Sequence, residues 1–199
     1  MGINDVARRI SMYTIFTPTI GRYRKTAIYA TCVSPLPTVA DEPDRTTQTV
    51  VAFTVRPLPP YPDIYWNTAG VLLVHERLAA IFDAFDTPHT SRPVVFQHPI
   101  THAVLPQGFD YRIYQIEATA PILIAQSPSD DTPHSTKAGS VLLNPAIGDH
   151  TPRVCLDHTW PTVVCVHRTV QASMKARRIT GGCFLSIAEW SRLQPAHGH

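Results

Sequence analysis

Apolar and polar residues alternate in several short segments of the chain, and this is the period of a β-strand that buries one face. Segments 10–16, 26–33, 47–55, 94–98 and 111–117 show it most clearly. Short apolar runs at 121–125, 140–143, 153–156 and 162–167 predict further strands. Loops rich in proline, glycine and aspartate separate them, so we expect a mixed or antiparallel sheet.

Three segments carry the three- and four-residue spacing of a helix. The longest is 71–85, where Val74, Leu78, Ile81, Phe82 and Phe85 form one apolar stripe. A second helix is predicted over 169–178, with Thr169 as N-cap. A third is predicted over 186–193, where Ser186 and Glu189 have the spacing of a capping box. The pattern as a whole predicts a single α+β domain with about three short-to-medium helices.

Nineteen prolines suggest a division of the chain. Residues 1–56 are expected to form an N-terminal β layer and residues 70–193 an α+β core. Between them, 57–69 contains four prolines and predicts a stiff, extended connector. Residues 194–199 are expected to fray. We find no internal repeat in the sequence.

Composition and charge narrow the class of protein. Hydrophobic residues make up 44% and charged residues 16%, which favours a packed globular chain over a disordered one. The net charge is only +2 and the basic residues are dispersed, so no nucleic-acid partner is expected. No apolar run has the length of a membrane span and no export signal is evident, so we expect no membrane association and a cytoplasmic location.

No catalytic pattern emerges from the reactive residues. Cys155 and Cys165 lie in apolar runs, where reduced, buried thiols are expected, although a bridge between them stays open. No nucleophile motif or phosphate loop is present. We therefore expect no catalytic residue, metal or cofactor. The alternative is an enzyme, metal-dependent or otherwise, with a non-local His/Asp site that gathers several of His98, His102, His150 and His158.

Candidate partner-binding residues are aromatic or charged side chains in predicted loops. Trp66 follows the proline-rich segment, and Trp160 lies beside His158 in a turn between two strands. Asp130 and Asp131 lie in a polar loop and could supply a local acidic patch. Tryptophan often anchors protein interfaces because it offers a large contact area at small entropic cost.

The order of several motifs resembles a family of immunity proteins of bacterial polymorphic-toxin systems. The matching segments are PDIYW at 62–66, GVLLVHERL at 70–78, PVVF at 93–96, YRIYQI at 111–116, SPSD at 127–130 and ITGGCF at 179–184. The resemblance implies that the chain binds and neutralises a cognate protein toxin, encoded by an adjacent gene, without catalysis. A small-ligand or regulatory binding module is a further alternative, and it requires a large apolar pocket.

Overall fold

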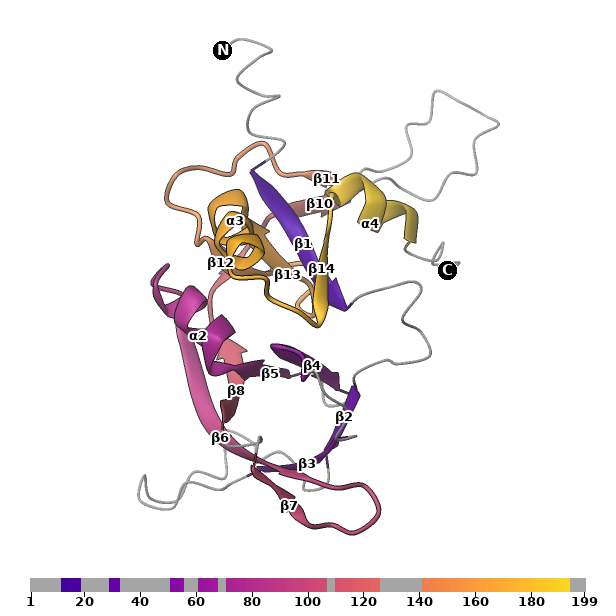
Figure 1. Ribbon diagram of the computed structural model, residues 1–199. Coiled ribbons are helices and arrows are strands. Elements are labelled where there is room, and N and C mark those ends of the chain that lie inside the picture. The colour runs from indigo at the N-terminus through magenta and orange to yellow at the C-terminus, as the bar shows by residue number, and fades with distance from the viewer. Residues whose placement is uncertain are drawn as a thin grey trace, which may run out of the picture.

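The computed structural model describes residues 12–18, 29–32, 51–55, 61–67, 71–106, 110–125 and 141–193, and their fold is α+β (Figure 1). The first group of elements is β1 (Tyr13–Pro18), β2 (Tyr29–Cys32), β3 (Val51–Thr54), β4 (Ile64–Asn67), β5 (Leu72–His75), α2 (Glu76–Asp83), β6 (His89–Gln97) and β7 (Val104–Leu105). The second group is β8 (Tyr111–Ile116), β9 (Thr119–Ala120), β10 (Leu123–Ala125), β11 (Val141–Leu143), β12 (Val154–Asp157), β13 (Val164–His167), α3 (Arg168–Ala176), β14 (Gly182–Leu185) and α4 (Ile187–Leu193).

Six strands close into a barrel, which forms the lower part of Figure 1. Their order is β3-β2-β4-β5-β8-β6, and a parallel pairing of β3 with β6 completes the ring. The barrel encloses its own apolar cluster, in which the ring of Tyr65 packs edge-on against those of Phe96 and Tyr111. Because the interior is filled by side chains, the barrel is a packed core.

A second, open sheet lies above the barrel, with the order β14-β1-β13-β12-β9. All of its pairings are antiparallel except the parallel pair β12–β9. The short β10–β11 pair forms a separate two-stranded sheet beside it. The expected mixed or antiparallel arrangement is therefore confirmed.

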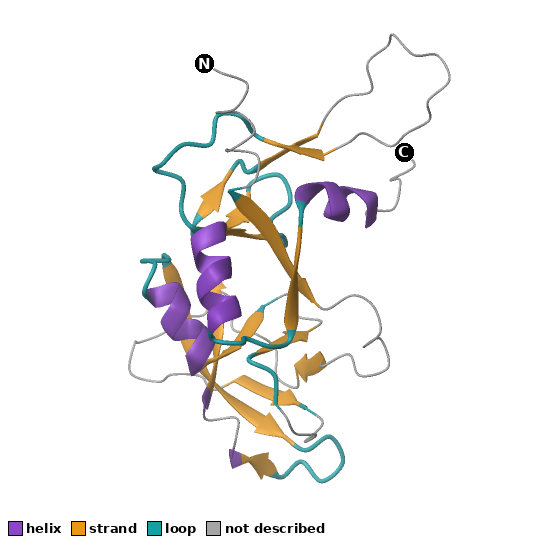
Figure 2. Cartoon of the chain, turned by 45° about the horizontal axis from the view of Figure 1, so that its top comes forward, coloured by secondary structure: helices purple, strands orange, loops and turns teal. Residues whose placement is uncertain are grey.

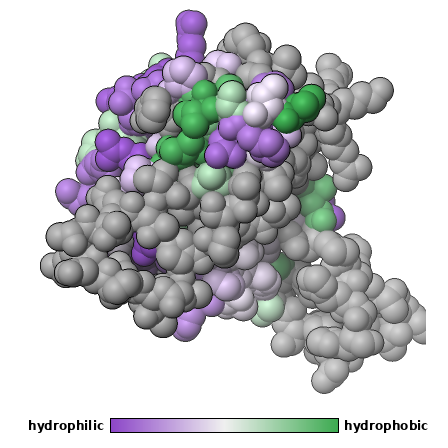
Figure 3. Space-filling model, turned by 90° about the horizontal axis from the view of Figure 1, so that it is seen from below, coloured by the Kyte–Doolittle hydropathy of each residue, from purple (hydrophilic) through white to green (hydrophobic). Residues whose placement is uncertain are grey.

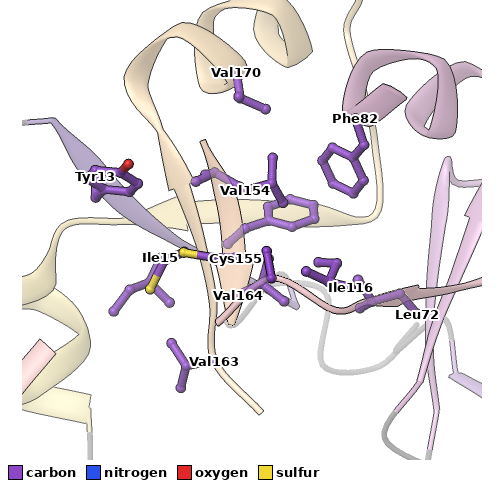
Figure 4. Close-up of a cluster of buried hydrophobic side chains, with 14 of the residues drawn as sticks. Tyr13, Ile15, Leu72, Phe82, Ile116, Val154, Cys155, Val163, Val164 and Val170 are labelled. Atoms are coloured by element: carbon purple, nitrogen blue, oxygen red, sulfur yellow. The ribbon is translucent and has the colours of Figure 1, made fainter. Parts of the chain in front are cut away.

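Helices α2 and α3 lie side by side and cover one side of both sheets (Figure 2). Their buried residues join the open sheet and the outer face of the barrel in one large core. Figure 4 shows Phe82 of α2 and Val170 of α3 above Val154, Cys155 and Val164 of the open sheet. Burial of such a side chain contributes about 1.5–3 kcal/mol each, so this shared core joins the two sheets into one domain.

The two sheets share one topology, which the sequence analysis did not detect because it found no internal repeat. In the barrel, the run β6-β8-β5-β4-β2 has the order and strand directions of β14-β1-β13-β12-β9 in the open sheet. In each sheet, the two strands of a hairpin are followed by a helix. The strand after that helix lies across the sheet from the hairpin, with one other strand between them. We call residues 12–106 the first half and residues 110–193 the second half.

The predicted helices are confirmed at two of three places. Helix α3 begins one residue before the predicted range, with His167 rather than Thr169 as its N-cap. The capping box of α4 is present, because the Ser186 hydroxyl accepts from the Glu189 N–H at 3.2 Å and Glu189 accepts from the Ser186 N–H at 2.8 Å. The long helix predicted over 71–85 is wrong in its first part, since residues 72–75 form β5.

The described C-terminal part of the segment predicted as a connector, 57–69, contains a strand of the barrel. Residues 64–67 form β4, and Asp63, Ile64 and Tyr65 are buried. The prolines dominate only as far as Pro62, after which the chain can donate hydrogen bonds to its neighbours in the sheet. Among the described residues, no helix is both long and apolar enough to cross a membrane.

Candidate partner-binding site

A hairpin formed by β6 and β7 projects from the lower end of the barrel (Figure 1). Its strands pair through Phe96 with Leu105 and through Gln97 with Val104. Phe96 is anchored in the barrel interior, so the base of the hairpin is fixed to the core. The turn at its tip comprises residues 98–103.

The turn is held by its own hydrogen bonds. The N–H of His98 donates to the carbonyl of Ala103 at 2.9 Å, and the N–H of His102 donates to the carbonyl of His98 at 3.0 Å. The Nδ1 atom of His98 accepts from the N–H groups of Ile100 and Thr101, both at 3.2 Å. Pro99 fixes one more backbone angle. The turn is therefore preorganised before any partner binds.

The turn and the start of β7 each present one apolar side chain to solvent. Ile100 is 81% exposed and Val104 is 53% exposed, the two highest values among the large hydrophobic residues that the structure describes. Figure 3 views the molecule from below, and on the coloured part of this face hydrophobic residues lie beside hydrophilic ones. Exposed apolar residues on a preformed loop are typical of protein-binding sites.

The β6–β7 hairpin lies outside the topology that the two halves share. In the second half, β14 occupies the place of the first part of β6, and the chain then enters α4. Within the described residues, the second half has no hairpin equivalent to β6–β7. A feature present in one copy is not required by the common fold, which makes it a candidate for function.

A second apolar surface lies on the β10–β11 pair. Ile124 and Leu142 are directly opposite each other across the two strands, and both are exposed. Their neighbours Val141 and Leu143 point the other way and pack against the large core. Helix α4 holds this pair in place, since the Ser191 hydroxyl accepts from the Val141 N–H at 3.1 Å.

Two predicted site residues, His158 and Trp160, share one turn. The buried carboxylate of Asp157 holds this turn by accepting from the N–H groups of Thr159 at 2.8 Å and Trp160 at 2.9 Å. His158 is exposed, whereas Trp160 is partly buried. The Trp160 ring packs edge-on against Trp190 of α4, with the ring centroids 5.7 Å apart.

Trp66, the third predicted site residue, bridges the two halves. Its indole N–H donates to the carbonyl of Gly181 at 2.8 Å, and its ring contacts Phe16 of β1. The side chain therefore contributes to the internal packing of the molecule. Asp130 and Asp131, the remaining candidates, lie outside the described residues.

Potential metal ligands and cysteine thiols are the side chains that bear on the alternative of an enzyme. No group of three or more His, Cys, Asp or Glu residues in this part of the chain could hold a metal ion. Cys155 and Cys165 are opposite one another in β12 and β13, and both are free thiols. Burial raises the pKa of Cys155 to about 12 and that of Cys165 still further, so both stay protonated at neutral pH.

Sequence reasoning weighed this hairpin only for its histidines and missed its tip. The available signal was the segment His98-Pro99-Ile100-Thr101-His102, a proline turn with an isolated isoleucine between apolar stretches. Comparison of the chain with protein-family models and with curated proteins found no match.

Proposed function

We propose that this chain is an immunity protein, which binds and neutralises a cognate protein toxin without catalysing a reaction. The observation that carries the proposal is the preformed β6–β7 turn, with Ile100 at its tip. A rigid turn loses little conformational entropy when it enters a partner's cleft, and an exposed isoleucine gains burial there. Both properties favour tight binding.

Three further features support the proposal. The motif order resembles that of toxin-immunity families. The paired thiols of β12 and β13 have raised pKa values, which disfavours a thiolate nucleophile. A neutraliser that protects the producing cell would act in the cytoplasm, where reduced cysteines persist. The free state of Cys155 and Cys165 accords with that location.

Growth rescue tests the function. The product of the adjacent gene is expressed in a sensitive host, with and without this chain. We expect growth arrest without the chain, recovery with it, and a stoichiometric complex on purification. If the neighbouring product arrests growth and this chain neither restores growth nor co-purifies with it, the proposal is wrong.

Two variants test the site. Ile100→Asp places a charge at the tip, and we expect binding to weaken by about 100-fold, because a central contact contributes about 2–4 kcal/mol. Leu193→Asp is the matched control, since Leu193 is also an exposed hydrophobic residue but lies on α4. Rescue by wild-type chain together with full rescue by Ile100→Asp would leave the function standing and reject the hairpin as its site.

A third variant separates the effect of the ordered turn from the effect of the Ile100 side chain. His98→Ala keeps Ile100 but removes the acceptor of two turn hydrogen bonds. We expect it to fold normally and to bind about tenfold more weakly, because the turn must then be ordered on binding.

A further inference from the structure

The two hairpins that lead into the helices have the same pairing register where they approach the helix. In the barrel, Ile64 is opposite Val74, and the N–H of His75 donates to the carbonyl of Asp63 at 2.8 Å. In the open sheet, Val154 is opposite Val166, and the N–H of His167 donates to the carbonyl of Arg153 at 2.7 Å. The separation between equivalent residues is 90 in the first strand (154 − 64) and 92 in the second (166 − 74).

Both helices begin in the same way. His75 caps α2 with φ −69° and ψ 150°, and His167 caps α3 with φ −68° and ψ 150°. Each imidazole accepts from the backbone N–H two residues later, at 3.1 Å from Arg77 and at 3.3 Å from Thr169. Histidine is not among the preferred N-cap residues, so its use at both equivalent positions is unexpected for two unrelated helices.

Both helices also end in the same way. A residue shortly after each helix has a positive φ: 51° at Asp86, three residues after the end of α2, and 53° at Arg178, two residues after the end of α3. The next N–H then donates five residues back, from Thr87 to Phe82 at 3.2 Å and from Ile179 to Met174 at 3.0 Å. This is the same Schellman closure in both copies, and in neither does the glycine that favours it occupy the left-handed position.

The strand inserted beside each hairpin repeats as well. Tyr111 of β8 is opposite His75, and Tyr13 of β1 is opposite His167. The two aromatic pairs are edge-on, with ring centroids 5.1 Å and 5.3 Å apart. The Tyr111 hydroxyl donates to the carbonyl of Pro62, and the Tyr13 hydroxyl contacts the carbonyls of Thr151 and Pro152 at 3.2 Å and 3.1 Å.

These inserted strands come from the opposite halves of the chain. Strand β1 begins the first half, yet it lies between β13 and β14 of the second. Strand β8 begins the second half, yet it lies between β5 and β6 of the first. Strands β2 and β9, which follow them, both return to their own half and pair in parallel with β4 and β12. Within the described residues, the exchange is therefore reciprocal and involves one strand of each half.

We propose that the chain consists of two copies of one folding unit that are joined in tandem and interlocked by exchange of their first strands. Each half is the binding partner of the other, and each provides a slot for a strand with the pattern Tyr-x-Ile followed by an aromatic residue. Tyr13, Ile15 and Phe16 fill one slot, and their equivalents at 111, 113 and 114 fill the other. Since β8 lies in the middle of a closed barrel, neither half can complete its sheet alone.

Cleavage of the folded chain tests this interlocking. A specific protease site is placed between Pro106 and Asp110, and the full chain is cut after folding. We expect the two pieces to elute together at the 22.1 kDa mass of the intact chain and to unfold in one transition. The midpoint should rise with protein concentration, because unfolding then also separates the pieces. In a control cut after Leu193, the midpoint should not change with concentration.

The opposite outcome is two pieces that elute separately and keep folded circular dichroism spectra, which would show two independent domains and overturn the proposal. A second measurement needs no inserted site. Ile15→Ala and Ile113→Ala shorten equivalent buried residues of the exchanged strands. In each variant we expect amide exchange in β5 and β13 to speed up together, whereas acceleration in only one of these two strands would contradict the interlocking.

Discussion

Asp157 ends β12 with a fully buried carboxylate, and its removal is expected to be costly. Its Oδ2 accepts from the N–H of Leu123 at 2.8 Å, while Oδ1 accepts from Thr159 and Trp160. Asp157→Ala leaves three backbone donors without this acceptor. An unsatisfied buried donor costs about 1–3 kcal/mol, so at the lower end of that range the three donors together cost about 3 kcal/mol. That is a large share of the stability of a typical domain.

Asp157→Asn sharpens the test because it changes one of the three contacts. The amide oxygen can still accept from Thr159 and Trp160, but the NH₂ group would face the N–H of Leu123. We therefore expect a loss of about 1.5 kcal/mol, roughly half that of the alanine variant. Asp149→Asn, in an exposed turn, is the matched control and should change stability by less than about 0.5 kcal/mol.

Urea unfolding followed by tryptophan fluorescence measures all three free energies of unfolding. Trp160 lies in the turn that Asp157 holds, so its emission also reports whether the native turn persists. The account of Asp157 fails if the asparagine variant is as stable as wild type, or if the alanine and asparagine variants lose the same amount.

Three further predictions follow from the two halves. Asp86→Gly and Arg178→Gly should each raise stability by about 0.5–1 kcal/mol in urea unfolding, because glycine adopts a positive φ without strain, and alanine at either site should give no gain. Burial and the charges of two nearby arginines lower the pKa of His167 from 6.5, so the unfolded chain binds the proton more readily than the folded chain does. The free energy of unfolding should therefore decline as the pH falls below about 6.5, and His167→Asn should make this decline less steep. Cys155, whose pKa burial raises to about 12, should react with a thiol reagent at pH 8 only in unfolded chain, and equally fast labelling of native protein would contradict its burial.

The sequence predicted most elements that have a clear strand or helix periodicity. It failed at residues 72–83, where strand β5 leads directly into helix α2. In β5, Leu72 and Val74 face the large core while Leu73 faces the barrel interior, so the three positions before His75 are all apolar. The apolar stripe of α2 continues directly from it. A strand buried on both faces has no alternation to distinguish it from a helix, and the histidine cap gave no conventional start signal.

The repeat escaped the sequence for a different reason. Identity between the halves is reduced to a few positions, such as Pro62 with Pro152, His75 with His167 and Tyr111 with Tyr13. In addition, the first strand of each half is in the other half's sheet, so spatial neighbours are not sequence neighbours. Only the pairing registers reveal the equivalence.

The candidate site was harder to predict because solvent exposure has no periodic signal. The tryptophans attract attention by type, but Trp66 and Trp160 are both committed to internal contacts with Gly181 and Trp190. Ile100 is unremarkable by type and becomes informative only through its place at the tip of a rigid turn.

Duplication supplies an internal comparison that an isolated fold lacks. Two copies that began alike keep in common what folding requires: the histidine caps, the helix closures and the tyrosine strands. Where the copies differ, the fold has tolerated change, and the differences lie at opposite ends of the molecule (Figure 1). The first copy ends in the β6–β7 hairpin, and the second ends in α4 with the adjoining β10–β11 pair. Substitutions in the shared elements should therefore lower stability and binding together, whereas substitutions at Ile100 should lower binding alone.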